Sequence, residues 1–214
     1  MQQRNAPSRF GIVIYADVEP IDIGGTVGVI SMARRVLPAI ESVTIAARSG
    51  PVRLAGGLSV VAQFGFQDHP PCDCFIVCGG PGWRAQVTDQ AMLAFLRRLP
   101  GGSAASVCTG GLILAAAGLL DGKRATTRRH AVGAEPAAPL ARLGTLAPTA
   151  EPIAAAIVDD RGIVTSGGVS LAIDGTLYLI GRQYGEDVRD EIARVIEYDR
   201  AFAANRAALG HFVA

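Results

Sequence analysis

The stretch Ser103–Gly118, which reads SAASVCTGGLILAAAG, constrains the fold of this 214-residue chain more than any other. Its small and β-branched apolar residues up to Val107 predict a short buried strand, and its alanine-rich second half predicts a buried helix. Cys108 lies on the glycine-containing turn between them. Such a turn presents its side chain at the carboxyl end of a sheet, with the N-terminus of the next helix directed at it. We therefore interpret Cys108 as a nucleophile, and we expect the helix dipole to favour its thiolate.

The rest of the chain alternates predicted strands with predicted helices. Apolar runs bounded by turn residues predict strands at 10–15, 42–47, 58–62 and 74–78. The segment 123–127 after an Asp-Gly turn predicts a further short strand, and 157–158 with 163–165 predict a hairpin. Helical spacing predicts helices over 21–37, 89–99, 131–140, 171–184 and 186–204, with N-caps at Thr88 and Ser170. This alternation predicts an α/β fold: a flavodoxin-like sandwich with a mostly parallel central sheet, helices on both faces and a nucleophile elbow, in one domain over 1–214.

Composition excludes several classes of protein. The net charge is +1 and the arginines cluster only in pairs, so we expect neither nucleic acid nor a membrane as partner. Four cysteines in a chain of this length do not make a disulfide framework. The polar segment Met1–Arg9 predicts a frayed leader without a secretion signal, and the apolar run Gly110–Leu120 is too short to span a membrane. We expect a soluble cytoplasmic protein.

Three loops with polar or glycine-rich residues follow predicted parallel strands, where ligand sites form in such sheets. They are Ala16–Asp22, Gly79–Gly82 and Cys108–Gly110. Free backbone N–H groups of Gly79 and Gly80, together with the N–H of Thr109, would suit an oxyanion hole. The alternative is that these glycines only form a turn.

Five motifs carry a resemblance that spans nearly the whole chain. They are VEPIDIGG at Val18–Gly25, FIVCGGPG at Phe75–Gly82, SVCTGGLILAAAGLLDGKRATT at Ser106–Thr127, VTSGGVSLAID at Val164–Asp174 and IEYDR at Ile196–Arg200. With these motifs the chain resembles the ThiJ/PfpI superfamily, whose fold is related to class I glutamine amidotransferases. It is most similar to the branch that contains isonitrile hydratases and the ligand-binding halves of AraC-type regulators.

The resemblance implies roles for particular residues. The nucleophile of the family matches Cys108, and its acidic partner matches Asp22, whereas Glu19 lies three residues too early in the motif. The oxyanion positions match the amides of Gly80 (or Gly79) and Thr109. In the family these groups face a small pocket near a dimer interface, so the resemblance implies a small-molecule substrate and a homodimer.

Several positions depart from the family pattern. Thr109 stands where protease-like and glyoxalase-like relatives have a histidine, which argues against a peptidase. Arg128 and Arg129 follow two threonines where the hydratase branch has His-Trp, so the pocket wall is altered. His130 is a candidate to replace that histidine through a shift of two residues, and an ordinary loop histidine is the alternative.

Several further residues invite a functional interpretation. Trp83 is either a pocket lid or the anchor of a helix start, and we favour the anchor. Cys72, Cys74 and Cys78 do not have zinc-ligand spacing and are expected to be small buried apolar residues, so we predict no metal site and no cofactor. Asp174 is expected to bind the backbone of 166–168.

These features favour a cysteine-dependent hydratase in which Cys108 and Asp22 convert an isocyanide and water into an N-substituted formamide, with Thr109 orienting the water. A ligand-sensing domain like that of AraC-type regulators is the alternative, although only 201–214 follow the IEYDR segment and no DNA-binding part fits there. A third possibility is a redox-responsive Cys108, which is compatible with the first.

Overall fold

An eight-stranded sheet forms the centre of residues 6–214, the part of the chain that the computed structural model describes. Its strand order is β12-β10-β11-β7-β6-β1-β2-β5. Neighbouring strands run parallel, except that β10 and β11 form an antiparallel hairpin. The strands are β1 (Ser8–Val13), β2 (Ile40–Ala46), β5 (Phe64–Gly65), β6 (Cys74–Val77), β7 (Ala104–Ser106), β10 (Ile157–Asp160), β11 (Ile163–Ser166) and β12 (His211–Val213).

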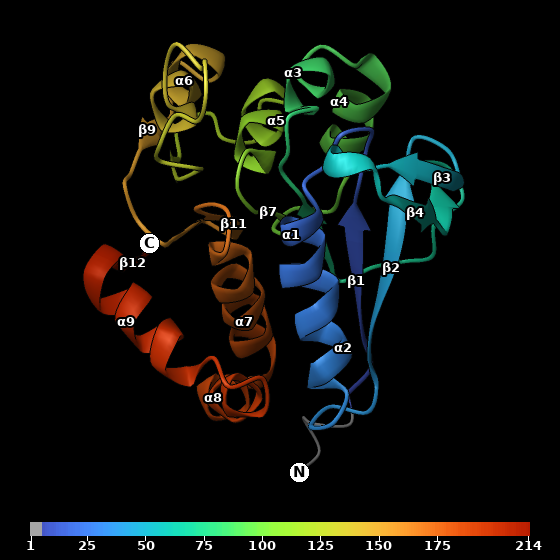
Figure 1. Cartoon of the computed structure of the whole chain (residues 1–214), viewed down its shortest axis with the longest axis vertical. Helices are drawn as coiled ribbons and strands as arrows, with labels where there is room; N and C mark the ends of the chain where they lie inside the picture. The colour runs from blue at the N-terminus through green and yellow to red at the C-terminus, as the bar shows by residue number, and fades with distance from the viewer. Residues whose placement is uncertain (1–5) are drawn as a thin grey trace.

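Helices cover both faces of this sheet (Figure 1). They are α1 (Pro20–Ile23), α2 (Val29–Ala33), α3 (Trp83–Gln86), α4 (Gln90–Arg97), α5 (Gly110–Ala116), α6 (Pro139–Leu146), α7 (Leu171–Tyr184), α8 (Glu186–Val195) and α9 (Asp199–Leu209). The crossovers from β1 to β2 and from β6 to β7 lead in opposite directions along the sheet, so right-handed connections place their helices on opposite faces. α2 packs against β2 and α7, whereas α5 packs against β6 and β7. The predicted flavodoxin-like α/β sandwich is confirmed.

Two short strand pairs lie outside the central sheet within 6–214. They are the antiparallel hairpin of β3 (Gly50–Arg53) with β4 (Ser59–Ala62), and the parallel pair of β8 (Arg124–Ala125) with β9 (Glu151–Pro152). The strands predicted at 58–62 and 123–127 therefore exist in shorter form, but they do not join the main sheet. Residues 1–5 of the expected leader Met1–Arg9 lie outside the described residues. Its last two residues, Ser8 and Arg9, belong to β1.

The uninterrupted helix predicted over 21–37 is wrong. α1 and α2 are joined by a π-helical segment, Gly24–Gly28. Thr26 Oγ1 donates a hydrogen bond of 3.0 Å to the carbonyl oxygen of Asp22. Gly25 lies so close to α7 that a Cβ atom there would be 2.7 Å from a side chain of that helix. Close packing of two helices and a competing hydroxyl explain why a wider turn replaces the regular one.

Two other predicted helices have the wrong bounds. The segment 131–140 is irregular as far as Pro139, which opens α6, because proline has no N–H to donate and suits the first turn of a helix. The helix predicted over 186–204 is two helices, α8 and α9. The chain breaks between them at Glu197, whose φ of 53° does not continue a right-handed helix.

The predicted N-caps are only partly correct. Asp89, not Thr88, caps α4, since its carboxylate accepts hydrogen bonds from the N–H groups of Ala91 (2.8 Å) and Met92 (3.0 Å). Ser170 stands at the N-cap of α7, but its side chain makes no capping hydrogen bond. The predicted bounds of α7 are confirmed.

The predicted role of Asp174 is also wrong. Its carboxylate accepts hydrogen bonds from Tyr198 Oη at 2.9 Å and from Asn205 Nδ2 at 3.1 Å, instead of binding the backbone of 166–168. Asp174 is fully buried in α7, and Asn205 lies on α9. This carboxylate therefore ties the C-terminal helix to the helical layer over the sheet.

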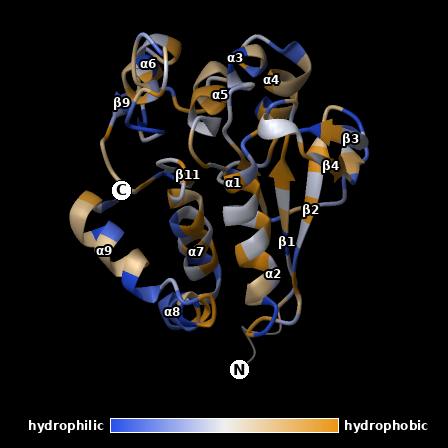
Figure 2. Cartoon of the chain, in the orientation of Figure 1, coloured by the Kyte–Doolittle hydropathy of each residue, from blue (hydrophilic) through white to orange (hydrophobic). Residues whose placement is uncertain are grey.

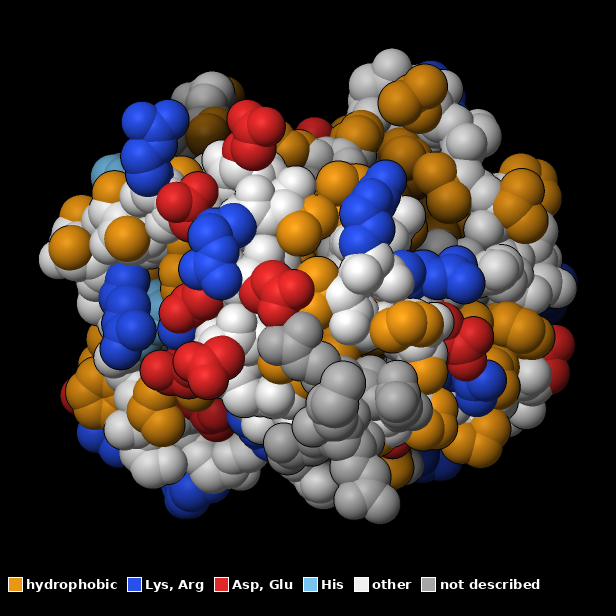
Figure 3. Space-filling view, turned by 90° about the horizontal axis from the view of Figure 1, so that it is seen from below, with side chains coloured by type: hydrophobic (Ala, Val, Ile, Leu, Met, Phe, Trp, Pro, Cys, Tyr) orange, Lys and Arg blue, Asp and Glu red, His pale blue; other side chains and the backbone are white. Residues whose placement is uncertain are grey.

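The central strands form the core. Phe10, Ile12 and Val13 of β1 have no exposed surface, as expected for a parallel strand buried on both faces. Hydrophilic residues gather on α8 (Figure 2), and basic and acidic side chains alternate on the face seen in Figure 3. Among the described residues, no helix has both the length and the apolar character that crossing a membrane requires.

Acid should loosen the C-terminal strand through His211. This ring lies edge-on to Tyr178 and Phe202, and burial, followed by the charges of Arg206 and Arg189, lowers its pKa from 6.5 to about 4. The unfolded chain therefore binds the proton more readily between these values, so the stability that the neutral ring contributes above pH 6.5 is lost as pH falls towards 4. Between pH 7 and about pH 4.5 the melting temperature of wild type should fall more than that of His211→Phe. Parallel curves in a thermal-shift series would contradict this.

Candidate active site

Three adjacent strands bring the candidate residues together. β7, β6 and β1 are neighbours and run parallel, so their carboxyl ends lie at one edge of the sheet. Cys108 follows β7, the pair Gly79 and Gly80 follows β6, and Asp22 lies in α1 after β1. Their close approach is visible at Gly79, where a Cβ atom would lie 2.8 Å from the Cβ of Cys108 and 2.5 Å from the amide nitrogen of Thr109.

The turn at Cys108 has the geometry of a nucleophile elbow. Cys108 has a φ of 52°, a conformation that costs energy for a residue with a side chain. Its backbone is fixed on both sides: its N–H donates to the carbonyl of Gly167 at 3.1 Å, and Thr127 Oγ1 donates to its own carbonyl at 2.6 Å. Gly110 lies directly against β6, since a Cβ there would be 2.0 Å from the Val77 carbonyl oxygen. Only glycine fits at that position.

The thiol of Cys108 is almost enclosed. The residue is 3% exposed, and a Cβ atom on Gly168 would lie 2.6 Å from its sulfur. Gly168 follows β11, so a fourth strand end contributes to the site. The glycine pair 167–168 allows the backbone to cover the sulfur without a side chain in the way.

Asp22 is a buried carboxyl group beside the Gly79 amide and the Cys108 thiol, both of which lower its pKa by hydrogen bonding. It has no exposed surface, and its Oδ2 accepts a hydrogen bond of 2.7 Å from the N–H of Gly79. Among the described residues, its Oδ1 accepts no hydrogen bond of good geometry. Burial raises the pKa of Asp22 to about 7, against the opposing effect of the Gly79 N–H. This carboxyl group can therefore both accept and release a proton near neutral pH.

The expectation of a thiolate-favouring site is not met in the free protein. Burial, followed by the charge of Asp22, raises the pKa of Cys108 to about 12. The N–H of Thr109 and the charge of Arg128 act in the opposite direction, but more weakly. The helix that follows the turn therefore does not compensate for the loss of water around the sulfur. Cys108 keeps its proton until a base takes it, and Asp22 is the carboxylate beside it.

The glycine amides are not free, contrary to the expectation of an oxyanion hole built from them. The N–H of Gly79 is used by Asp22, and the N–H of Gly80 donates to Thr109 Oγ1 at 2.9 Å. Gly80 has a φ of 144°, in the range that favours glycine. The hydroxyl of Thr109 thus anchors the Gly79–Gly80 turn, and the two amides position the acid and the turn around the thiol.

A cavity of about 840 Å³ opens above the thiol. It is lined by Glu19, Ile21, Gly80, Pro81, Trp83, Arg84, Cys108, Thr109, Arg128, Val132, Ala134, Glu135, Pro136 and Val169. The candidates from sequence that line it are Glu19, Gly80, Trp83, Cys108, Thr109 and Arg128. Asp22 and Gly79 are not part of its lining, and His130 is exposed and lies outside it. Trp83 combines both suggested roles, because it is the first residue of α3 and also forms part of the cavity wall.

Sequence reasoning missed an ion cluster in the wall of this cavity. Arg128 Nη2 lies 2.7 Å from Glu135 Oε2, and Arg84 Nη2 lies 2.9 Å from Glu135 Oε1. Glu135 stands in the irregular segment between β8 and α6, where the sequence predicted a helix. Single charged residues in a loop do not form a recognisable sequence motif. The cluster becomes apparent only when the fold brings its three residues together.

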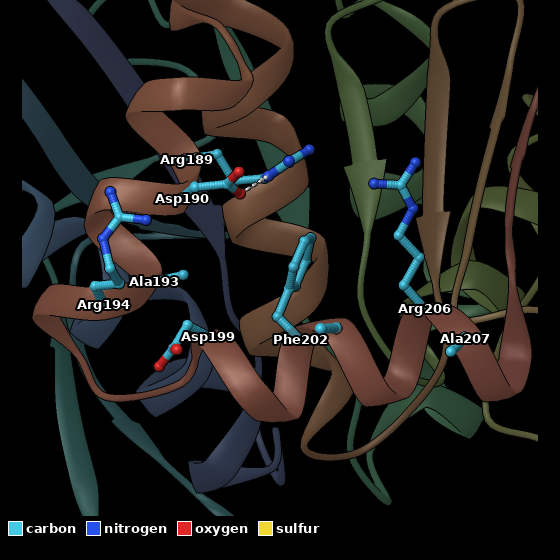
Figure 4. Close-up of a pocket in the computed structure, with 9 residues that line it drawn as sticks. Arg189, Asp190, Ala193, Arg194, Asp199, Phe202, Arg206 and Ala207 are labelled. Atoms are coloured by element: carbon cyan, nitrogen blue, oxygen red, sulfur yellow. Dashed lines mark hydrogen bonds and ion pairs between the residues drawn. The ribbon is translucent and has the colours of Figure 1, made fainter.

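A second hollow lies between α8 and α9, and it contains none of the residues proposed from sequence (Figure 4). In it the guanidinium of Arg189 lies over the ring of Phe202, 5.2 Å from its centroid, and Arg206 stands on α9 to one side of that ring. Its lining includes no cysteine, serine, threonine or histidine. No cluster of three or more metal-ligating side chains occurs among residues 6–214, and Cys72, Cys74 and Cys78 are unpaired there, with Cys78 buried and the other two half-buried.

Comparison with known proteins gives a consistent picture. The model of the DJ-1/PfpI family matches residues 9–181. Isonitrile hydratase from Pseudomonas putida is 30% identical over 194 residues, which are 89% of this chain and 78% of that protein. The HTH-type transcriptional regulator GbdR from Pseudomonas aeruginosa is 30% identical over 93% of this chain, which spans only 53% of the regulator. The crystal structure of a ThiJ/PfpI family protein from Pseudomonas syringae has a TM-score of 0.76 at 25% identity, covering 91% of this chain and 76% of that one. The resemblance drawn from the motifs is confirmed.

Buried Asp22 should make the protein less stable as pH rises. Its pKa is about 7 in the folded chain instead of 3.8, so the folded state binds the proton more tightly, and stability is lost between about pH 4 and pH 7. A shift of this size corresponds to on the order of 4 kcal/mol above pH 7. In Asp22→Asn the neutral amide removes this loss. In urea unfolding from about pH 4 to pH 8, the free energy of unfolding of Asp22→Asn should rise relative to that of wild type across that interval. A pH-independent difference between the two would count against a buried, proton-binding carboxyl group.

Proposed function

The chain belongs to the DJ-1/PfpI family, and we propose that within it the protein is a hydratase that converts an isonitrile and water into an N-substituted formamide. The observation that carries the proposal is the enclosed pair of Cys108 and Asp22, with a carboxyl pKa of about 7 beside a thiol that keeps its proton. An isonitrile carbon accepts a nucleophile and a proton at the same atom, so it needs such a pair.

The first half-reaction forms a covalent thioimidate. The Cys108 sulfur attacks the isonitrile carbon while the Asp22 carboxylate takes the thiol proton. Asp22 then delivers this proton to the same carbon, which carries the lone pair after the attack. A carbon–sulfur bond and a carbon–hydrogen bond have formed, one sulfur–hydrogen bond has broken, and Asp22 is a carboxylate again.

The second half-reaction releases the product. Water adds to the thioimidate carbon, and Asp22 takes a proton from it and passes one to the nitrogen. The carbon–sulfur bond then breaks, the new hydroxyl group becomes the formamide carbonyl, and its proton returns to the sulfur of Cys108. The sum of both halves is one isonitrile and one water consumed for one formamide.

Thr109 and the glycine turn act as positioning groups in this scheme. The N–H of Thr109 favours negative charge on the sulfur, as its effect on the pKa of Cys108 indicates. Its hydroxyl is bonded to Gly80, which fixes the turn whose other amide binds Asp22. Because Thr109 is not a histidine, the Cys-His pair that a peptidase of this superfamily would use is missing at this position.

A second candidate function is ligand sensing without turnover. The similarity to the regulator GbdR over 93% of this chain favours it, since the same pocket could bind an effector. Both candidates predict binding of a small molecule, but only the hydratase predicts a covalent intermediate and a formamide product.

Formamide production from cyclohexyl isocyanide tests the proposal. We expect Cys108→Ser and Asp22→Asn to lower kcat/KM by about 10²–10⁴, the range for loss of a nucleophile or of a general acid–base group. Wild-type kcat/KM should rise with pH and level off above about pH 7, because Asp22 must start as a carboxylate. His130→Gln, at an exposed position outside the cavity, serves as the matched control and should retain wild-type activity.

Two outcomes would decide against the hydratase. Binding of the isocyanide without any formamide, in a protein whose Cys108 still alkylates with iodoacetamide, would favour the sensor. Undiminished turnover in Asp22→Asn would remove the proton shuttle on which the mechanism depends.

A further inference from the structure

The carboxylate of Glu135 is the most heavily bonded polar group of the cavity wall. It accepts hydrogen bonds from Arg128 Nη2 at 2.8 and 2.7 Å, from Arg84 Nη2 at 2.9 Å and from the N–H of Val132 at 3.0 Å. The side chains of Glu135 and Arg128 are only 10% and 11% exposed. Burial opposes the ionisation of Glu135, but these donors outweigh it and keep its pKa below the usual value.

The positive charge of Arg128 is paired with the carboxylate of Glu135. Its guanidinium lies within electrostatic reach of the reacting pair, since its charge lowers the pKa of both Cys108 and Asp22. Arg84 shares the same carboxylate and lies over the Trp83 ring, 5.0 Å from its centroid. Without Glu135, two cations would face the space above the thiol.

The mouth of the cavity is apolar. Ile21 is 50% exposed and Val132 is 58% exposed, and both line the cavity. Trp83, Pro81 and Pro136 add to the apolar lining of the cavity. A substrate with its reactive carbon at Cys108 would therefore extend its substituent past apolar side chains.

We propose that Glu135 determines the specificity of this cavity: together with Glu19, the other acidic residue of the lining, it offsets the charges of Arg128 and Arg84, and so it selects uncharged isonitriles with an apolar substituent and rejects anionic ones. The inference rests on the proposed hydratase function. A substrate carboxylate would lose its water at the apolar mouth and would then meet the carboxylates of Glu135 and Glu19. An apolar substituent gains from the same surfaces by leaving water.

Two substrates that differ only in charge test the proposal. Methyl isocyanoacetate is neutral, and isocyanoacetate carries a carboxylate. Wild type should turn over the ester with a kcat/KM at least about tenfold higher than that of the anion, as expected for one unbalanced charge at an effective dielectric constant near 20.

Two variants should shift this ratio in opposite directions. Glu135→Gln keeps the shape of the side chain but unmasks the two arginines, so the anion-to-ester ratio should rise about tenfold. Arg84→Met removes one cation, so the ratio should fall. Glu41→Gln breaks an ion pair with Arg9, away from the cavity, and controls for net charge by leaving the ratio unchanged. If the two substitutions acted only by loosening the loop, the anion-to-ester ratio would shift in the same direction in Glu135→Gln and in Arg84→Met.

A binding measurement separates this inference from the hydratase proposal. N-formylglycine and its methyl ester, the corresponding formamides, can be titrated calorimetrically into Cys108→Ser with and without Glu135→Gln. A preference for the ester that Glu135→Gln reverses supports the charge selection even if no isonitrile is converted, an outcome that would overturn the hydratase alone. Equal affinities for both formamides in both proteins, or a turnover ratio that neither Glu135→Gln nor Arg84→Met shifts, would overturn the inference.

Discussion

The hydrogen bond from the Gly79 amide to Asp22 links the ends of two neighbouring strands, and the candidate site depends on it. It is 2.7 Å long and fully buried, and it fixes the carboxyl group at the edge of the sheet where Cys108 leaves β7. The approach is so close that a side chain at Gly79 would collide with the elbow. One oxygen of Asp22 is thereby held by this amide, and the other accepts no hydrogen bond of good geometry among the described residues.

Burial gives this pair its acid–base character. The same enclosure that raises the pKa of Cys108 to about 12 raises that of Asp22 to about 7, because removing water disfavours both anions. The consequence is a division of roles. In the proposed hydratase reaction the sulfur would form the bond to carbon and the carboxyl group would move the proton, so that charge need appear on only one of them at a time.

The titratable groups in the cavity wall differ from the Cys108–Asp22 pair in their charge. There Arg128, Arg84 and Glu135 are ionised and paired, and the remaining lining is largely apolar. The segment that carries Glu135 has no regular structure, so its position depends on these ion pairs and on the turn around Val132. Loops of this kind vary more easily than strand ends do, which suits the substrate-selecting role proposed for Glu135.

The sequence by itself determined the strand ends and the elbow. Apolar runs that stop at Gly79 and at Cys108 are local signals, and parallel strands must place their ends at one edge of a sheet. The residue pattern alone therefore predicts that the loops Ala16–Asp22, Gly79–Gly82 and Cys108–Gly110 lie together, whereas the choice of Asp22 within the first loop came from the family resemblance. The bounds of the helices do not follow from such local signals, since the π-helical turn at Gly24–Gly28 depends on packing against α7.

Only the tertiary structure decided which groups of the site are ionised and which partners they have. The thiol is covered by the glycines after β11, the two glycine amides are already bonded, and Glu135 meets two arginines from other segments. Each of these facts arises from contacts between residues far apart in the chain. A pKa or an ion pair depends on the distance to such neighbours and on the water they exclude, and no local pattern of residues encodes either quantity.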